Sequence, residues 1–319
     1  MKKVLFALVI FICSCYSGIA QEELSLKRDG GILCGTLLMP EGVVKPPVVL
    51  IIAGSGPTDR DGNSHIGLKT DSYKLIAEGL KAEGIASFRF DKRMIGASRW
   101  DNVNEEEHVF ENSIDDVRAL ADMLYNDGRF SEVVLAGHSE GSLIAMAVAQ
   151  DNQQVAKVIL IAGAGRPIDI ILKDQLASQP FSEDTHAEID TILESLRRGE
   201  RVAEVSPILM SVFRPSVQPF AISSMRYIPT DLISRLKQPI MVIQGGADIQ
   251  ITEVDYNELI SAQPAAIGLL IPDMSHPLKR ATSTNKVEQM LTVYNNPNLP
   301  LHEEFLPALI KFAKVPSHP

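Results

Sequence analysis

Short, mainly apolar runs alternate with longer amphipathic stretches from residue 48 onward. The runs are rich in β-branched residues and too short for helices, which is typical of strands buried on both faces. We therefore expect strands at 48–52, 85–90, 133–136, 158–162, 240–243 and 267–271. Apolar residues at helical spacing predict helices at 72–83, 113–125, 142–150 and 303–313. Such an alternation predicts an α/β fold, a mostly parallel central sheet with helices on both faces.

Two local signals mark where elements turn or begin. Residues 24–39 have the pattern of a hairpin with its turn at Asp29-Gly30-Gly31, because glycine supplies the positive φ that a tight turn needs. Ser113 stands three residues before Asp116, a spacing typical of a helix start. We therefore expect the helix of residues 113–125 to begin at Ser113.

One interval interrupts the alternation. Roughly 75 residues separate the strands at 158–162 and 240–243, far more than the short loops usual in α/β units. The interval contains amphipathic segments at 168–177 and 186–197 and an apolar, proline-punctuated stretch at 207–229. Because these apolar residues need a surface to pack on, they favour a helical cap inserted over the sheet rather than a long surface loop. The predicted division is a core of residues 21–165 and 237–319 with a cap of residues 166–236.

The first 20 residues have the pattern of a signal peptide. Lys2 and Lys3 precede nine apolar residues, too few to span a bilayer, and Gly18-Ile19-Ala20 offers small residues for cleavage before Gln21. The segment predicts an exported protein, periplasmic or secreted, with no membrane span. A buried N-terminal strand is one alternative. Another is a lipoprotein with lipidated Cys15, although the sequence around it fits that pattern loosely.

The net charge and the cysteine content limit the classes of partner and of site that we expect. The net charge is −10, and removing residues 1–20, with two lysines and no acidic residue, would make it −12. Such a chain repels phosphate backbones, so we expect no nucleic-acid partner. After cleavage Cys34 is the one cysteine left, in a strand pattern that favours a packed side chain over a nucleophile. No zinc-type spacing is present, and we expect neither a metal nor a cofactor.

The pentapeptide Gly137-His138-Ser139-Glu140-Gly141 carries the main chemical signal. It follows an apolar strand and opens an apolar helix, the context in which a serine on a strained turn exposes its hydroxyl as a nucleophile. The flanking glycines leave room for the neighbouring chain and for the helix. His138 is adjacent to Ser139 and points elsewhere on a tight turn, so we expect it to pack or hydrogen-bond beneath the turn.

A serine nucleophile needs a base, and the base needs an orienting acid. Chain order in this type of fold places an acid and then a histidine after the serine. His276 follows the strand at 267–271 and is the predicted base, whereas His186, His302 and His318 lie in the cap, beside the last helix and in the tail.

Asp248 follows the strand at 240–243 and a Gly-Gly turn, and is the predicted acid, although such an aspartate can also simply cap a turn. Asp255 is expected to face solvent from the next helix, and Asp273 lies too close to His276 along the chain to approach it well. The predicted oxyanion donors are the backbone N–H groups of Glu140 and Ser55. The glycines around Ser55 could also simply make a turn.

Together these residues resemble the α/β-hydrolase superfamily, and within it the serine aminopeptidase-type, lysophospholipase-like domain and a bacterial carboxylesterase subgroup. The resemblance covers about residues 24–315. Four further stretches carry it: Ala53-Gly-Ser-Gly-Pro-Thr-Asp-Arg-Asp-Gly-Asn63, Phe88-Arg-Phe-Asp-Lys-Arg-Met-Ile-Gly-Ala-Ser98, Leu236-Lys-Gln-Pro-Ile-Met-Val-Ile-Gln-Gly245 and Tyr294-Asn-Asn-Pro-Asn-Leu-Pro-Leu301. Two departures, Met94 in place of a glycine and Ala53 where many relatives have histidine, bear on pocket shape rather than on the catalytic groups.

The resemblance implies a serine hydrolase that cleaves small carboxylic esters, often with short acyl chains, through an acyl-enzyme and without a cofactor. An aminopeptidase or amidase with the same triad is an alternative, for which Glu183, Asp184, Glu188 and Asp190 are candidate ligands of a substrate amine, although a solvated helix face explains them as well. A catalytically silent binding protein is a third interpretation, because a fold does not determine a function.

Overall fold

The computed structural model describes residues 21–102 and 104–317, so the predicted signal peptide lies outside the described residues. Within them, nine strands form one sheet and two short strands form a separate hairpin. The sheet contains β1 (Gln21–Arg28), β2 (Gly31–Leu38), β3 (Val48–Ile52), β6 (Ala86–Phe90), β7 (Arg99–Trp100), β8 (Val133–His138), β9 (Val155–Ile161), β10 (Ile240–Gly245) and β11 (Ile267–Ile271), and the hairpin contains β4 (Asn63–Ser64) and β5 (Leu68–Lys69).

The strand order is β1-β2-β6-β3-β8-β9-β10-β11, with β7 paired to β2. From β6 to β11 neighbouring strands are parallel, whereas β1, β2 and β6 pair antiparallel. The predicted hairpin is thus confirmed, and so is the mostly parallel sheet. Because parallel strands end at one edge, the loops after β3, β8, β10 and β11 meet there.

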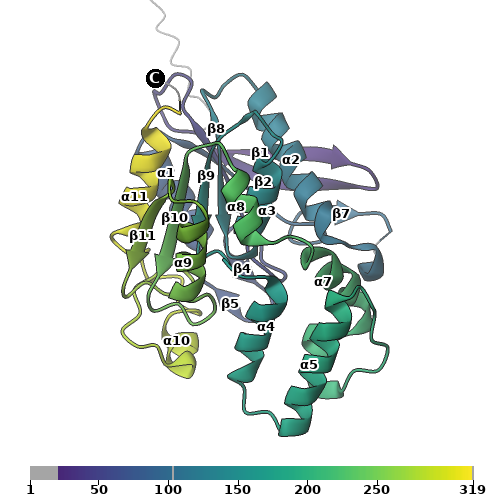
Figure 1. Cartoon of the computed structure of the whole chain (residues 1–319). Helices are drawn as coiled ribbons and strands as arrows, with labels where there is room; N and C mark the ends of the chain where they lie inside the picture. Colours follow the sequence, from purple (N-terminus) through teal and green to yellow (C-terminus); the bar gives the residue numbers. More distant parts are fainter. Residues whose placement is uncertain (1–20, 103, 318–319) are drawn as a thin grey trace, which may run out of the picture.

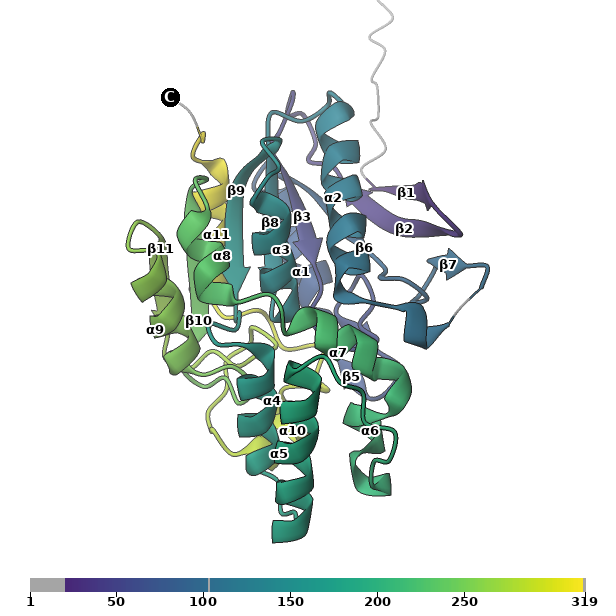
Figure 2. The same cartoon turned by 45° about the vertical axis from the view of Figure 1, so that its right-hand side comes forward.

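Helices cover both faces of the sheet, as predicted (Figure 2). Their bounds are α1 (Ser72–Ala82), α2 (Phe110–Asn126), α3 (Glu140–Ala149), α4 (Ile168–Ala177), α5 (Glu183–Arg197), α6 (Met210–Phe213), α7 (Gln218–Ser224), α8 (Pro229–Arg235), α9 (Glu253–Ala262), α10 (Lys286–Thr292) and α11 (Phe305–Lys314). Side chains of α2, α3 and α8 share a core with one face, and α1 and α11 share a second core with the other. Alternate residues of β3 enter the two cores, so the strand is apolar throughout.

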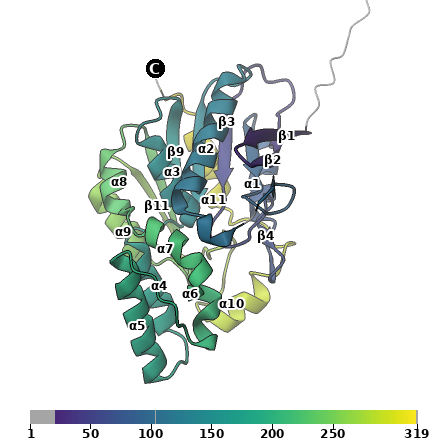
Figure 3. The ribbon, with the colours of Figure 1, turned by 90° about the vertical axis from the view of Figure 1, so that its right-hand side faces the viewer.

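Helices α4 to α8 occupy the interval between β9 and β10. Four of them, α4 to α7, extend beyond the edge of the sheet (Figures 1 and 3). They enclose a small core of their own, in which Ile192, Leu196 and Phe213 are buried. Helix α8 instead packs beside α9, and its Ile233 belongs to the main core. No helix in the described ranges is long and apolar enough to cross a bilayer.

The start of α2 differs from the expectation. The helix begins at Phe110, three residues before Ser113. The Asn112 side chain accepts a hydrogen bond of 2.9 Å from the Val109 N–H, and the buried Phe110 donates its own N–H to Ser223 Oγ at 2.8 Å. Tertiary burial of Phe110 therefore sets the start of the helix, which the local Ser113–Asp116 spacing could not indicate.

Candidate active site

Ser139 occupies a sharp turn between β8 and α3. Its φ and ψ are 54° and −122°, a region that L-residues avoid, so the turn is strained. The Ser139 N–H donates to the Ile161 carbonyl on β9 at 2.8 Å, which fixes the turn against the sheet. The strain is held by the surrounding strands, and the side chain is left half-buried at the end of the sheet.

The glycines on either side of Ser139 are required by space. A Cβ at Gly137 would lie 2.1 Å from the carbonyl oxygen of Gly141. A Cβ at Gly141 would lie 2.3 Å from the carbonyl oxygen of Ile52 on β3. Both contacts are far inside van der Waals distance, so the approach of strand and helix at this turn depends on glycine.

Asp248 and His276 are joined by a hydrogen bond. Asp248 Oδ2 lies 2.7 Å from His276 Nδ1, and both side chains are buried. Asp248 Oδ1 meanwhile accepts the N–H groups of Gln250 at 2.7 Å and Ile251 at 3.0 Å, so the aspartate also caps its own turn. Because a carboxylate only accepts, Nδ1 carries the proton in neutral His276, and Nε2 is left with a free lone pair.

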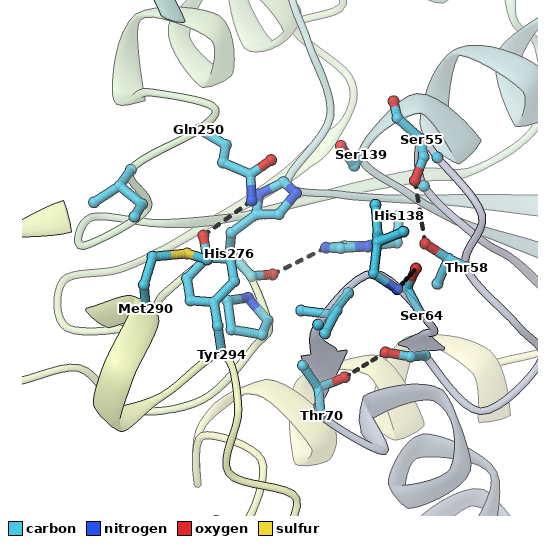
Figure 4. A pocket seen from close by; sticks show the side chains of 18 of the residues that line it. Ser55, Thr58, Ser64, Thr70, His138, Ser139, Gln250, His276, Met290 and Tyr294 are labelled. Carbon is cyan, nitrogen blue, oxygen red and sulfur yellow. Dashed lines mark hydrogen bonds between the residues drawn. The ribbon is translucent and has the colours of Figure 1, made fainter. Parts of the chain in front are cut away.

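Ser139 and His276 line one cavity of about 480 Å³ at the carboxyl edge of the sheet. Figure 4 shows the two side chains in this cavity, with Gln250, Tyr294 and Met290 beyond His276 and with Ser55 on the other side of Ser139. Leu176 of α4 also lines the cavity, so the inserted helices form part of its wall. The structure thus brings the predicted nucleophile and base together with their acid.

Ser55 and Glu140 stand side by side. Ser55 Oγ donates to Glu140 Oε2 at 3.2 Å, and within the described part of the chain neither backbone N–H of these two residues donates a hydrogen bond. The N–H of Gly54 is engaged, since it donates to the Tyr73 hydroxyl at 3.1 Å. A Cβ at Gly54 would lie 3.0 Å from Ser139 Cβ, so this loop approaches the serine closely.

His138 lies beneath the turn, as predicted. Its Nδ1 lies 2.8 Å from the Tyr73 hydroxyl, and its Nε2 lies 2.9 Å from the backbone carbonyl of His276. The carbonyl can only accept, so Nε2 carries the proton and Nδ1 accepts from Tyr73. Burial and, to a lesser extent, the adjacent His276 lower the pKa of His138 to about 3, so the ring is neutral near pH 7.

Asp255 does not face solvent, and that expectation was wrong. Its side chain is fully buried and pairs with the Arg166 guanidinium, with Oδ2 3.0 Å from Nη2. The N–H groups of Gly165 and Arg166 also donate to Oδ1, each at 3.2 Å. Arg166 lies at the start of the inserted segment, so the burial of Asp255 depends on a contact that its own helix does not reveal. Asp273 pairs instead with His302, at 2.8 Å.

Several residues around the site were missed by sequence reasoning. Tyr294 and Met290 line the cavity from α10 and the loop after it, an element the apolar pattern did not predict. Tyr73 was assigned only to a helix, and Lys92 and Tyr294 only to family motifs, without a role for any of the three side chains. Each acts through a tertiary contact with no local sequence signal. Among the described residues, no group of three or more His, Cys, Asp or Glu side chains could hold a metal ion.

Comparisons with known proteins identify similar sequences and folds. The esterase EstD of Thermotoga maritima is 28% identical over 271 residues, which cover 80% of this chain and 60% of EstD. Est1E of Butyrivibrio proteoclasticus, solved with ferulic acid, superposes with a TM-score of 0.61 at 16% identity, covering 91% of this chain and 96% of its own. The Pyrococcus furiosus esterase Pf2001 superposes with a TM-score of 0.55 at 16% identity, covering 93% of each chain.

The structural likenesses are too distant in sequence to show more than a common fold, and this chain spans only 60% of the length of EstD. The model of the family described as serine aminopeptidase, S33, matches residues 66–267, which is more than half of the chain. The protein therefore belongs to the serine aminopeptidase S33 family and has the α/β-hydrolase fold.

Proposed function

We propose that the protein is a serine hydrolase that cleaves small carboxylic esters, with Ser139 as nucleophile, His276 as base and Asp248 as the orienting acid. The observation that carries the proposal is the shared cavity. A strained serine at the end of β8 faces the same space as a histidine whose Nδ1 is held by a buried aspartate. This arrangement supplies an activated nucleophile in a preformed pocket.

In the proposed reaction, His276 Nε2 takes the Ser139 proton as Oγ attacks the ester carbonyl. Asp248 keeps the imidazole in the required tautomer and stabilises the imidazolium that forms. The N–H groups of Ser55 and Glu140 bind the oxyanion, and the N-terminus of α3 adds positive partial charge there. The tetrahedral intermediate then collapses, and the alcohol leaves with the proton from His276. Water attacks the acyl-enzyme by the same route and releases the acid.

The lining of the cavity favours an ester over a substrate with a free amine. Within the described residues the cavity wall contains no Asp or Glu side chain that could hold an ammonium group. The candidate acids of α5 lie away from it: Asp190 pairs with Lys173 at 2.7 Å, and Glu188 accepts the Ser206 N–H at 2.7 Å. The similarity to EstD points in the same direction. An aminopeptidase activity is therefore the less supported alternative.

We further propose a short acyl group and an exported protein. A cavity of about 480 Å³ must hold both the acyl and the alcohol parts of the ester, which favours small substrates. Export rests on the basic and apolar pattern of residues 1–20. N-terminal sequencing of the exported protein tests this directly, because Gln21 at the new terminus supports cleavage after Ala20. A lipid on Cys15 would instead support the lipoprotein alternative.

The activity is tested with p-nitrophenyl esters of rising acyl length, comparing residues 21–319 with the Ser139→Ala variant. We expect a burst followed by turnover that is absent in Ser139→Ala, with a maximum at short acyl chains. The variant also measures background hydrolysis by other histidines. Turnover equal in both proteins, or no turnover together with no labelling of Ser139 by a fluorophosphonate, would contradict the proposal and favour a binding role.

A further inference from the structure

Lys92 reaches from the end of β6 to the loop that follows β3. Its Nζ donates to the backbone carbonyl oxygen of Gly54 at 2.5 Å. The neighbouring Asp91 accepts the Arg60 N–H at 2.9 Å and the Ala97 N–H at 2.8 Å, so the backbone beside Lys92 is held on both sides. The backbone beside Lys92 is therefore held in place, and the lysine side chain reaches the Gly54 carbonyl from it.

That carbonyl belongs to the same amide group as the Ser55 N–H. The described peptide bonds are all trans, and in a planar trans amide the C=O and N–H point in opposite directions. A lysine that holds the Gly54 carbonyl on one side therefore aims the Ser55 N–H toward the other. Ser55 lines the cavity with Ser139, whereas Lys92 lines a second cavity of about 460 Å³, and Gly56 and Pro57 border both.

Gly54 makes such a restraint necessary. Glycine suits this position because a Cβ would lie 3.0 Å from Ser139 Cβ and crowd it, but glycine also lets the following amide plane rotate at little cost. The amide before Gly54 is fixed by the bond from its N–H to the Tyr73 hydroxyl. Lys92 fixes the amide after it. The two contacts together determine the orientation of both amide planes of this glycine.

We propose that Lys92 is a positioning residue of the reaction, which orients and polarises the Gly54–Ser55 amide so that its N–H stabilises the oxyanion. A cation on the carbonyl oxygen draws electron density through the amide and makes the N–H a stronger donor. Burial lowers the pKa of the Lys92 ammonium, whereas the nearby Glu140 carboxylate raises it and so favours the charged form. The N–H of Glu140 is the second proposed donor. The inference rests on the proposed ester hydrolysis at Ser139.

The test compares the full-length protein with Lys92→Met, Lys92→Arg and Arg93→Met. Methionine keeps the length of the side chain without a donor, and arginine keeps a cationic donor for which the second cavity has room. Arg93→Met is the matched control, since Arg93 pairs with Asp116 and makes no contact with Gly54. Each protein is assayed for kcat, for KM and for the rate constant with which a fluorophosphonate labels Ser139.

We expect Lys92→Met to lower kcat by about 10- to 100-fold and to change KM by no more than about threefold. This fall in kcat is at most as large as the one caused by removing an oxyanion donor. The labelling rate constant should fall in proportion, because the phosphonyl oxygen occupies the same position as the oxyanion. Lys92→Arg should restore most of kcat. If Lys92→Met does not fold, Lys92→Gln replaces it, with the same expected loss.

The inference is overturned if Lys92→Met keeps kcat within about twofold of the unmodified protein, if KM alone changes, or if Arg93→Met loses as much kcat. Failure of the proposed function looks different, since the unmodified protein would then not hydrolyse esters. In that case the ratio of labelling rate constants still decides the role of Lys92, provided that Ser139 is labelled. An unlabelled Ser139 contradicts both proposals.

Discussion

Tyr73 and His138 share a hydrogen bond of 2.8 Å, although they are 65 residues apart. Tyr73 also accepts the Gly54 N–H, and His138 donates to the backbone carbonyl of His276. The chain of bonds therefore runs from the loop after β3, beneath Ser139, to the loop that carries the proposed base. The two buried rings thus hold together the loop after β3, the turn at Ser139 and the loop of His276, whose spacing matters for the proposed catalysis.

Replacing Tyr73 by phenylalanine should weaken this connection without changing the shape of the core. The variant leaves the Gly54 N–H and His138 Nδ1 without their partner, so we expect the free energy of unfolding to fall by about 1–3 kcal/mol. We also expect kcat to fall by about tenfold, because small displacements of reacting groups are costly. Urea unfolding and ester turnover measure the two effects.

Tyr256→Phe is a suitable control for that experiment, since Tyr256 is half-buried on α9, away from the catalytic cavity. It should keep kcat near that of the unmodified protein. Equal turnover in Tyr73→Phe and Tyr256→Phe would mean that the Tyr73 hydroxyl does not position the loops.

The buried neutral ring of His138 should make stability depend on pH. Its folded pKa of about 3 lies below the ordinary value of 6.5, so between these values the unfolded chain binds a proton that the folded chain does not. The free energy of unfolding therefore falls as the pH falls through this window, by at most about 1.4 kcal/mol per pH unit from this group. The dependence fades above pH 6.5, because the unfolded chain then loses the proton as well.

The contribution is isolated by comparing urea unfolding of the unmodified protein and His138→Gln at pH values from 4 to about 7.5. Carboxylates titrate in both proteins, so the difference in slope reports His138 alone. We expect the unmodified protein to lose stability more steeply below pH 6.5. Parallel slopes would show that His138 is protonated in the folded protein or is exposed to solvent.

Asp248→Asn should abolish most of the activity while the fold remains. An asparagine that turns its amide toward His276 donates to Nδ1, which places the imidazole proton on Nε2 and removes the lone pair needed by the base. An equivalent change in a serine protease triad lowers kcat by about 10⁴, and we expect a loss on the order of 10³–10⁴ here. Ester turnover and thermal unfolding are measured together.

Asp255→Asn is the matched control for Asp248→Asn. Asp255 is also buried, but it pairs with Arg166 rather than with His276. Its removal should lower the free energy of unfolding by about 3 kcal/mol, because Arg166 loses its buried partner, and should leave kcat within a few-fold. If Asp255→Asn lost as much kcat as Asp248→Asn, neither carboxylate could be assigned a specific catalytic role.

The site was predictable where its geometry is local. The turn at Ser139 needs glycine at 137 and 141 for reasons of space that any strand–turn–helix of this kind imposes. Asp248 and His276 follow from chain order, because loops after parallel strands meet at one edge of the sheet. Most strands were equally visible, since a strand buried on both faces is a continuous apolar run.

What could not be predicted depends on distant partners. Asp255 has the pattern of a solvent-facing helix residue, and the loop at Gly165 and Arg166, about 90 positions earlier, covers it. Lys92 donates a hydrogen bond to the Gly54 carbonyl, and the Tyr73 hydroxyl accepts one from the Gly54 N–H. The hydrophobic periodicity of the sequence indicates neither contact. Helix α10 is short and exposed apart from Gln289, so it has no apolar stripe of useful length. These contacts arise from how the chain packs as a whole.

Met94 stands where the family motif has glycine, and the structure shows what that exchange does to the backbone. Its φ is 63°, in the left-handed region that glycine adopts freely and other residues adopt at a cost of roughly 1–2 kcal/mol. The residue is 39% exposed, which limits the packing that offsets the strain. Met94→Gly removes the strain but adds about 0.5–1 kcal/mol of backbone entropy to the unfolded chain.

We therefore expect Met94→Gly to raise the free energy of unfolding by roughly 0.5–1 kcal/mol, measured by urea unfolding. Ala97→Gly is the control in the same loop. Ala97 is exposed and its φ is not positive, so glycine there gains no relief of strain and should lower stability by about 0.5–1 kcal/mol. A loss of stability in Met94→Gly as large as that in Ala97→Gly would mean that the Met94 side chain stabilises this loop by more than its backbone strain costs.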